Sequence, residues 1–402
     1  MSSTLGELLK GVAEPDQGSH FLAQYGMRRN PFPPARTIYP EVIYNQVEAL
    51  RLFAEGVKGV LGDTPARRTL ALLGGTGQGK SHFLRHCQYE VKRANIPLVT
   101  VEFLAGTSSA VVLVRDIYRA VDEHLKANGE TDLLSAVISR LEDDSFGPVR
   151  QTDLRSALAT LRQASQPNSQ PAGLHGQYTA EVLRDVCWRW LQGETLTQTE
   201  RRYLHVSGRL STASLMARVM TELFALARLQ KHFQGVMICL DEVEAVFFSG
   251  VPVRRIQAFL QDMRYMFDEA VGQTSGYSLL ILAGSTPRGA TDLREYNYPL
   301  FQRLGFETEA RVSLHEVDTL DEARHFAEVY VRFELEEFNR ERSASVAFEK
   351  ARQLITEEDL ERAFYGRSKN PSADVRNQAR LLAELHRIVE EKNPDRAVPT
   401  SQ

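Results

Sequence analysis

One eight-residue stretch, Gly74 to Ser81, constrains the fold of this chain more than any other. It reads GGTGQGKS and matches the pattern G-x-x-x-x-G-K-[ST]. The apolar run 68–73 before it predicts a buried strand, and the stretch 80–93 after it predicts a helix. Glycines let successive backbone N–H groups surround phosphate oxygens, and the positive end of the following helix points at the same anion. We therefore expect a strand–loop–helix unit that binds a nucleotide.

The residues of this loop have distinct expected roles. Lys80 places a cation on the β- and γ-phosphates, and Ser81 offers its hydroxyl to Mg²⁺. His82, which follows Ser81 directly, is counted with the nucleotide contacts. The expected cofactors are ATP and Mg²⁺. The nucleotide contacts predicted from this stretch are Gly74, Gly75, Thr76, Gly77, Gln78, Gly79, Lys80, Ser81 and His82.

Strand and helix patterns alternate along much of the chain. After the loop and its helix come a strand at 97–103, a helix at 108–125, a helix at 215–229, a strand at 236–240, a helix at 254–269, a strand at 278–283 and a short strand at 311–314. This alternation predicts an α/β fold, with a parallel sheet covered on both faces. From about 316 onward the pattern is helical only, which predicts a small all-α lid domain.

The predicted domains follow from these patterns. They are an N-terminal lead-in at 1–36, a nucleotide-binding core at 37–315 with a helical insertion at about 130–210, a helical lid domain at 316–392, and a polar tail at 393–402. The net charge of −4 gives no global basic signal for nucleic acid. The sequence shows no signal peptide and no apolar run of membrane-spanning length, and its three cysteines have no disulfide-framework spacing. We therefore expect a cytoplasmic protein without membrane contact.

Two acids follow the predicted strand 236–240. That strand would end where ligands sit in open α/β sheets. Asp241 would hold Mg²⁺ directly or through water, and Glu242 would orient and polarise the attacking water as a general base. In the competing interpretation, the strand merely ends in surface acids. The phosphate loop upstream strongly favours the functional interpretation over this one. Glu244 is within reach, but the sequence assigns it no role.

Three further positions complete the predicted site. A hydroxyl after strand 278–283, first Thr286 and second Ser285, would bond the γ-phosphate or its water, unless Ser-Thr-Pro only forms a turn. Arg303 would reach a neighbouring subunit's γ-phosphate, or it is an exposed helix arginine with an acidic neighbour. Arg376 would contact the nucleotide from the lid, with Arg380, one turn on, as its rival.

Two weaker patterns favour ordinary packing. His82 and His86 have the i, i+4 spacing of metal ligands, but no third ligand lies near in sequence, so helix packing is favoured. Trp188 and Trp190 have rings that stack on bases in other proteins, but they stand in an apolar helical stretch, so core packing is favoured.

The order of these motifs resembles the AAA+ superfamily, and its initiator and transposition-regulator branch in particular. GGTGQGKS resembles the Walker A motif, MICLDE Walker B, AGSTP sensor 1, PLFQRL the arginine-finger segment and SADVR sensor 2. The lead-in Tyr25–Phe32 is similar to a segment that usually runs near the adenine in that branch. The two arginines, Arg303 and Arg376, correspond to the family pattern by position.

A closer resemblance is to ATP-binding proteins of bacterial BREX-type phage-exclusion systems, over roughly residues 40–390. The segments that carry it are Gly79–Leu84, Trp190–Glu194, Leu215–Leu229 and Phe233–Glu244. It implies an ATP-hydrolysing, nucleotide-dependent oligomer (a ring, dimer or filament) that acts on DNA or DNA-bound partners and meets other defence-system proteins. Two alternatives stay open: a DNA-coating transposition regulator driven by ATP, and a nucleotide-gated switch with negligible turnover.

Overall fold

The structure is a computed structural model that describes residues 20–104, 109–141, 146–166, 178–248, 250, 252–271, 276–366 and 377–393. Contacts divide the chain into two compact units, each of which is described by itself. Unit 1 combines residues 1–46, 76–86 and 314–402, and unit 2 combines 47–75 and 87–313. The unit boundaries therefore do not follow chain order, and the predicted domain limits stay a prediction.

Unit 2 is built on a parallel sheet, as the alternating pattern predicts. Its described residues form five strands in the order β2-β3-β4-β1-β5. The strands are β1 (Arg67–Leu73), β2 (Leu98–Leu104), β3 (Gly235–Asp241), β4 (Ser278–Ser285) and β5 (Arg311–Ser313). Every residue of β3 and β4 is buried. Such continuous apolar strands are typical of parallel sheets with both faces covered.

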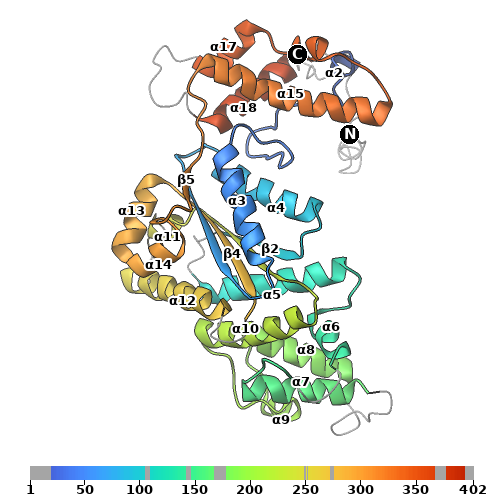
Figure 1. The fold of residues 1–402 in the computed structure, drawn as a ribbon, viewed down its shortest axis with the longest axis vertical. Helices are drawn as coiled ribbons and strands as arrows, with labels where there is room; N and C mark the ends of the chain where they lie inside the picture. Colours follow the sequence, from blue (N-terminus) through green and yellow to red (C-terminus); the bar gives the residue numbers. More distant parts are fainter. Residues whose placement is uncertain are drawn as a thin grey trace, which may run out of the picture. The chain divides into compact units, whose positions relative to one another are not determined.

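Alternate residues of β4 face different helices, which places helices on both faces of the sheet (Figure 1). Leu280 faces α3 (Val47–Val60), because a Cβ built on Gly56 of that helix would lie 3.1 Å from the Leu280 Cδ1 atom. Leu279 and Ile281 instead belong to the cluster that contains Phe267 of α12 (Val253–Val271). The predicted fold class, a parallel α/β core followed by helices, is confirmed.

The remaining helices of unit 2 connect these strands. They are the second half of α4 (Lys80–Arg93), α5 (Ala110–Ala127), α6 (Leu133–Ser139), α7 (Thr152–Ala164), α8 (Ala180–Leu191), α9 (Gln198–Leu204), α10 (Ala213–Leu229), α11 (Ala245–Phe248), α13 (Pro287–Tyr296) and α14 (Tyr298–Arg303). The bounds of α4, β2 and β3 lie within one residue of the predicted ones. The helix α3 begins at Val47, where unit 2 begins, whereas residues up to Gln46 belong to unit 1.

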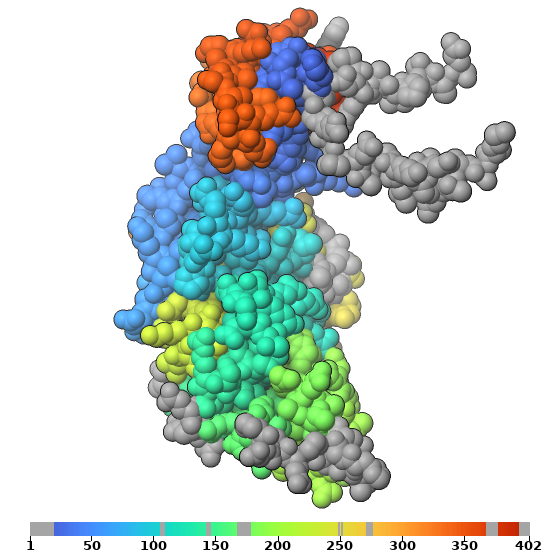
Figure 2. Space-filling model, turned by 90° about the vertical axis from the view of Figure 1, so that its right-hand side faces the viewer, coloured from blue at the N-terminus to red at the C-terminus, as the bar shows by residue number. Residues whose placement is uncertain are grey.

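The predicted insertion at 130–210 is helical and contains α6 to α9. It lies beside α5 and α10 and shares one apolar cluster with the sheet (Figures 1 and 2). Trp190 is fully buried there, and its indole N–H donates to the Gly208 carbonyl at 2.9 Å. Trp188 is partly buried and meets the Tyr118 ring edge-on at 6.0 Å. The favoured interpretation of both tryptophans as packing residues is confirmed.

Unit 1 joins the lead-in to the C-terminal helices. Its helices are α2 (His20–Ala23), the first half of α4, α15 (Leu320–Arg342), α16 (Phe348–Arg352), α17 (Glu357–Tyr365) and α18 (Gln378–Lys392). Phe32 is fully buried, 6.2 Å from the Tyr330 ring of α15. The Arg28 guanidinium bonds the buried Glu334 carboxylate at 2.8 Å, and Asn30 donates to the His386 carbonyl at 3.0 Å. These contacts make residues 25–32 part of the core of unit 1.

Two further observations concern the apolarity of the helices and the state of the cysteines. None of the helices in the described part of the chain is long and apolar enough to cross a membrane. All three cysteines, Cys87, Cys187 and Cys239, are buried as free thiols. Burial raises the pKa of the Cys187 and Cys239 thiols to about 12, and it raises the pKa of Cys87 well above its ordinary value.

Candidate nucleotide site

Three strands of unit 2 end at the same edge of the sheet, because β1, β3 and β4 are parallel neighbours. Hydrogen bonds connect the turns after β1 and β3 to the last two residues of β4. The Gly74 N–H after β1 donates to the Ser285 carbonyl at 3.2 Å, and the Val243 N–H after β3 donates to the Gly284 carbonyl at 3.2 Å. The structure thus brings the start of the glycine loop and the turns predicted as Walker B and sensor 1 to one edge.

The glycine loop has the backbone that phosphate binding requires. Gly77 and Gly79 adopt φ angles of +77° and +88°, which L side chains rarely adopt. The next residue, Lys80, is buried and begins α4, whose amino end is the positive end of the helix dipole. The loop therefore fits the phosphates of a nucleotide.

Within unit 1, the loop also contacts the start of α18. The Ala379 N–H donates to the Gly77 carbonyl at 3.1 Å. A Cβ on Gly77 would lie only 2.1 Å from Asn377 Oδ1, so this close approach requires glycine. The predicted lid arginine, Arg376, lies outside the described residues. Its rival Arg380 is in the first turn of α18, where its N–H donates to Asn377 Oδ1 at 3.0 Å.

The two acids predicted as Walker B differ in their surroundings. Asp241 is the last residue of β3 and is buried, and its Oδ1 atom accepts the Glu242 N–H at 3.0 Å. Glu242 has left the strand and is exposed, with an unusual φ of +49° for a residue with a side chain. A carboxylate such as that of Asp241 is the oxygen ligand that Mg²⁺ prefers. The donor set therefore fits the predicted cation.

Ser285 ends β4 and Thr286 follows it, and their hydroxyls have different partners. Ser285 is fully buried, and its hydroxyl donates to the Thr286 carbonyl at 3.1 Å. The Thr286 hydroxyl oxygen accepts the Gly289 N–H at 3.1 Å and so caps α13. That bond leaves the Thr286 hydroxyl hydrogen available for another acceptor. This cap is a structural role, as in the competing interpretation that Ser-Thr-Pro only forms a turn. It is compatible with a second role of the Thr286 hydroxyl at the γ-phosphate or its water.

The sequence missed Glu244 as a member of this group. Its side chain is buried, and its Oε1 atom accepts the Thr286 N–H at 2.9 Å. Its Oε2 atom is also buried and has no hydrogen-bond partner within the described residues. An acid placed directly before the apolar run Ala245–Phe248 is the one sequence signal that indicates its burial.

Arg303 lies at the end of α14 and forms an ion pair within unit 2. Its Nε atom bonds Asp268 Oδ1 at 2.7 Å, and Arg67 bonds the same oxygen at 2.9 Å. Burial alone would raise the pKa of Asp268, but the hydrogen bonds from the two arginines outweigh it and lower that pKa. The side chain of Arg303 is 30% exposed. The acidic neighbour expected by the simpler interpretation is therefore present, and a role in another subunit stays a prediction.

The histidine pair of α4 holds residues 39 and 40 within unit 1. His82 Nε2 bonds the Tyr39 carbonyl at 3.1 Å, and His86 Nδ1 bonds the Pro40 carbonyl at 2.7 Å. Burial lowers the pKa of His82, which favours a neutral ring that donates. Both rings thus bond backbone carbonyls, as packing residues do. The described residues contain no group of three or more His, Cys, Asp or Glu side chains that could hold a metal ion. A nucleotide contact by His82 stays a prediction.

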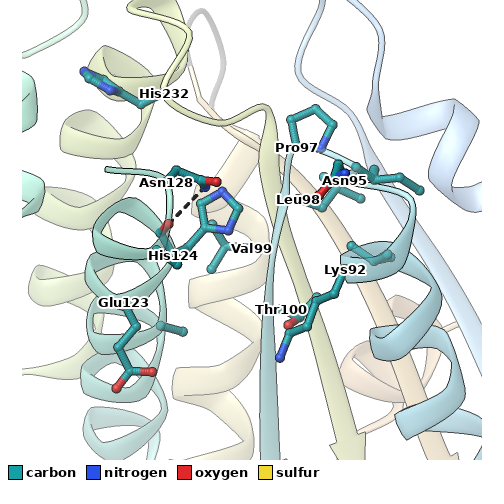
Figure 3. A pocket seen from close by; sticks show the side chains of 14 residues that line it. Lys92, Asn95, Pro97, Leu98, Val99, Thr100, Glu123, His124, Asn128 and His232 are labelled. Carbon is teal, nitrogen blue, oxygen red and sulfur yellow. Dashed lines mark hydrogen bonds between the residues drawn. The ribbon is translucent and has the colours of Figure 1, made fainter. Parts of the chain in front are cut away.

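A cavity of about 590 Å³ in unit 2 lies at the start of β2 (Figure 3). Lys92 lines one side, and His124 of α5 and its C-cap Asn128 line the other, where the Asn128 amide donates to the His124 carbonyl at 3.0 Å. Burial, with a further contribution from Lys92, lowers the pKa of His124. Because this cavity begins at the amino end of a strand, it is separate from the nucleotide site at the carboxyl ends.

Comparisons with known proteins identify the family. The ORC1 protein of Aeropyrum pernix, solved in complex with DNA, is 14% identical, with a TM-score of 0.33 over 85% of this chain and 66% of that chain. This likeness is distant and spans less than two thirds of that protein. No curated protein matches the chain. The sequence model of the BREX system ATP-binding protein BrxC/D matches residues 64–321, which is more than half of the chain. The chain therefore belongs to the BrxC/D family of BREX system ATP-binding proteins.

Proposed function

We propose that this chain hydrolyses ATP as a P-loop AAA+ ATPase of a BREX-type phage-defence system. The observation that carries the proposal is the meeting of the turns after β1 and β3 with the end of β4 at one sheet edge, linked by the Gly74–Ser285 and Val243–Gly284 hydrogen bonds. Ligands of open α/β sheets bind at such an edge. Family membership supports the nucleotide as ATP.

The proposed site divides its work among a few side chains. Lys80 contacts the β- and γ-phosphates, while Ser81 and Asp241 hold Mg²⁺, which neutralises phosphate charge when bound. Glu242 orients the attacking water and takes up its proton. Thr286 donates its free hydroxyl hydrogen to the γ-phosphate or to that water.

Steady-state ATP hydrolysis, measured beside nucleotide binding, tests this proposal. We expect Lys80→Ala to lose both binding and turnover, because it removes the phosphate cation. We expect Glu242→Gln to bind ATP like the wild type and to lose turnover by at least about 100-fold, as expected when a general base is removed. Wild-type turnover in Lys80→Ala would contradict the proposal. Tight binding with negligible turnover in the wild type would favour the nucleotide-gated switch.

We further propose that the chain acts as a nucleotide-dependent oligomer on DNA or on DNA-bound partners, together with other defence-system proteins. Its membership in a BREX family supports such partners. Electron microscopy with duplex DNA and a non-hydrolysable ATP analogue tests this part. Rings or dimers support it, whereas continuous filaments on DNA would favour the DNA-coating regulator. Monomers that ignore DNA would contradict both.

A further inference from the structure

Glu244 occupies an unusual place between two turns of the candidate site. It stands three residues after Asp241, immediately before α11, and only 8% of its surface is exposed. Its Oε1 atom accepts the backbone N–H of Thr286 at 2.9 Å. A carboxylate from the turn after β3 thus holds the backbone of the turn after β4.

The bond from Glu244 completes the cap of α13. Thr286 is the residue that caps this helix, and its hydroxyl oxygen accepts the Gly289 N–H. In a capping box, the side chain at the position of Gly289 would accept the Thr286 N–H in return. Gly289 has no side chain, and Glu244 supplies the missing acceptor from another turn.

The fit around Gly289 shows that Glu244 fills that space. A Cβ built on Gly289 would lie 2.3 Å from the Glu244 Cβ and 2.8 Å from the Ser285 hydroxyl oxygen. Contacts this short do not occur, so glycine at 289 is what admits Glu244. Both bonds to Thr286 therefore depend on Glu244 and Gly289 being packed together.

Packing alone does not account for a carboxylate at this position. A buried carboxylate is costly unless its oxygens are hydrogen-bonded, and Glu244 Oε2 has no partner within the described residues. A glutamine would accept the Thr286 N–H equally well through its amide oxygen. The side chain is thus placed to fix the Thr286 backbone from one oxygen, Oε1.

We propose that Glu244 is a positioning residue for ATP hydrolysis, which acts by fixing Thr286 relative to the turn that carries Asp241 and Glu242. This inference rests on the proposed function. It differs from a base role because one oxygen of Glu244 is engaged by a backbone N–H, whereas Glu242 is exposed. The two roles predict different responses to glutamine, which accepts a hydrogen bond but cannot accept a proton.

Hydrolysis by wild type, Glu244→Gln and Glu244→Ala, each in the Thr286 and Thr286→Ala backgrounds, tests the inference. We expect Glu244→Ala to lower kcat by about 10-fold or more, the size expected for one charge-assisted hydrogen bond, with ATP binding unchanged. Glu244→Gln should keep kcat within about 3-fold, because its amide oxygen preserves the bond. In Thr286→Ala, Glu244→Ala should cause little further loss, because the hydroxyl that it positions is already absent.

Several results would overturn the inference. Equal losses in Glu244→Gln and Glu244→Ala would indicate that the negative charge is needed, as for a base. Losses that add fully to that of Thr286→Ala would show that Glu244 does not act through Thr286. If Glu244→Ala lost ATP binding together with kcat, while Glu244→Gln kept both, Glu244 would have a general role in holding the structure of the site. Unchanged kcat in Glu244→Ala overturns the inference alone, whereas a wild type without turnover overturns the proposed function and the inference with it.

Discussion

At the residue scale, Gly289 is a position where even one added methyl group would clash, because its Cβ would lie 2.3 Å from the Glu244 Cβ. We expect Gly289→Ala to destabilise the protein by about 1–3 kcal/mol, the usual cost of overpacking, because its methyl group would displace Glu244. Urea denaturation measures this change. Gly62→Ala is the matched control, since a Cβ there meets nothing within 4 Å, and it should change stability by less than about 0.5 kcal/mol. Equal effects of the two substitutions would contradict the crowding at Gly289.

Asp268 gives a second residue-scale prediction, on the effect of acid. Its pKa is lowered in the folded protein, so its contribution to stability is present above the ordinary pKa of about 3.9 and is lost as the pH falls through the lowered value. Asp268→Asn should therefore be less stable than the wild type near pH 6, and the difference should shrink below pH 4. Urea midpoints measured between pH 6 and pH 3 would show this. A difference that is constant with pH would contradict the ion pairs with Arg67 and Arg303.

Sequence and structure agree unevenly among the site residues. The glycine loop and Asp241 were predictable because their spacing and the apolar strands beside them are local signals. Glu244 was not, because its role depends on a hydrogen bond to Thr286, 42 residues away. Nothing in the residues around position 244 encodes that partner.

At the element scale, the first half of α4 connects the phosphate loop to the segment that contains Tyr39. His82 donates to the Tyr39 carbonyl, and burial lowers its pKa. Stability from this neutral ring is present above the ordinary histidine pKa of about 6.5 and is lost as the pH falls from there through the lowered folded value. His82→Gln keeps a donor but cannot be protonated. As the pH falls from 7.5 to 5.5, the free energy of unfolding of His82→Gln should rise relative to that of the wild type. Urea denaturation at each pH measures this difference. Parallel pH profiles of the two proteins would be inconsistent with a buried neutral His82.

The strands of the sheet were easier to predict than the lead-in. β3 and β4 contain the unbroken apolar runs 236–240 and 279–283, so their type and position follow from the local sequence pattern. The lead-in instead gains its place from Arg28 and Asn30, whose partners Glu334 and His386 lie more than 300 residues away. Short helices such as α11 and α13 were also missed, because four to ten residues carry too little periodicity.

At the scale of the whole molecule, the open question is whether one chain completes the site of another. If Arg303 acts in a neighbouring subunit, an Arg303→Ala chain keeps Glu242 but lacks the arginine that its neighbour needs. A Glu242→Gln chain keeps that arginine but lacks its own general base. Mixing the two variants should then restore part of the hydrolysis that each has lost alone. The readout is ATP turnover across mixing ratios at constant total protein.

The ion pair in unit 2 supplies the control for that mixture. Arg67 bonds the same Asp268 oxygen as Arg303, but no role at the nucleotide is proposed for it. Arg67→Ala should therefore keep most of the turnover. Equal losses in Arg67→Ala and Arg303→Ala, with no recovery on mixing, would assign Arg303 to holding Asp268 within its own chain.

The burial of all three thiols has a practical consequence for such experiments. Because the pKa values of Cys87, Cys187 and Cys239 are raised, folded protein should react only slowly with a thiol reagent at pH 8, and urea should expose all three groups. Rapid reaction of three thiols in the folded protein would contradict their burial. A cysteine introduced at Gly62 would then be the only fast-reacting group, so fluorescent dyes attached there could report assembly without removal of any native cysteine.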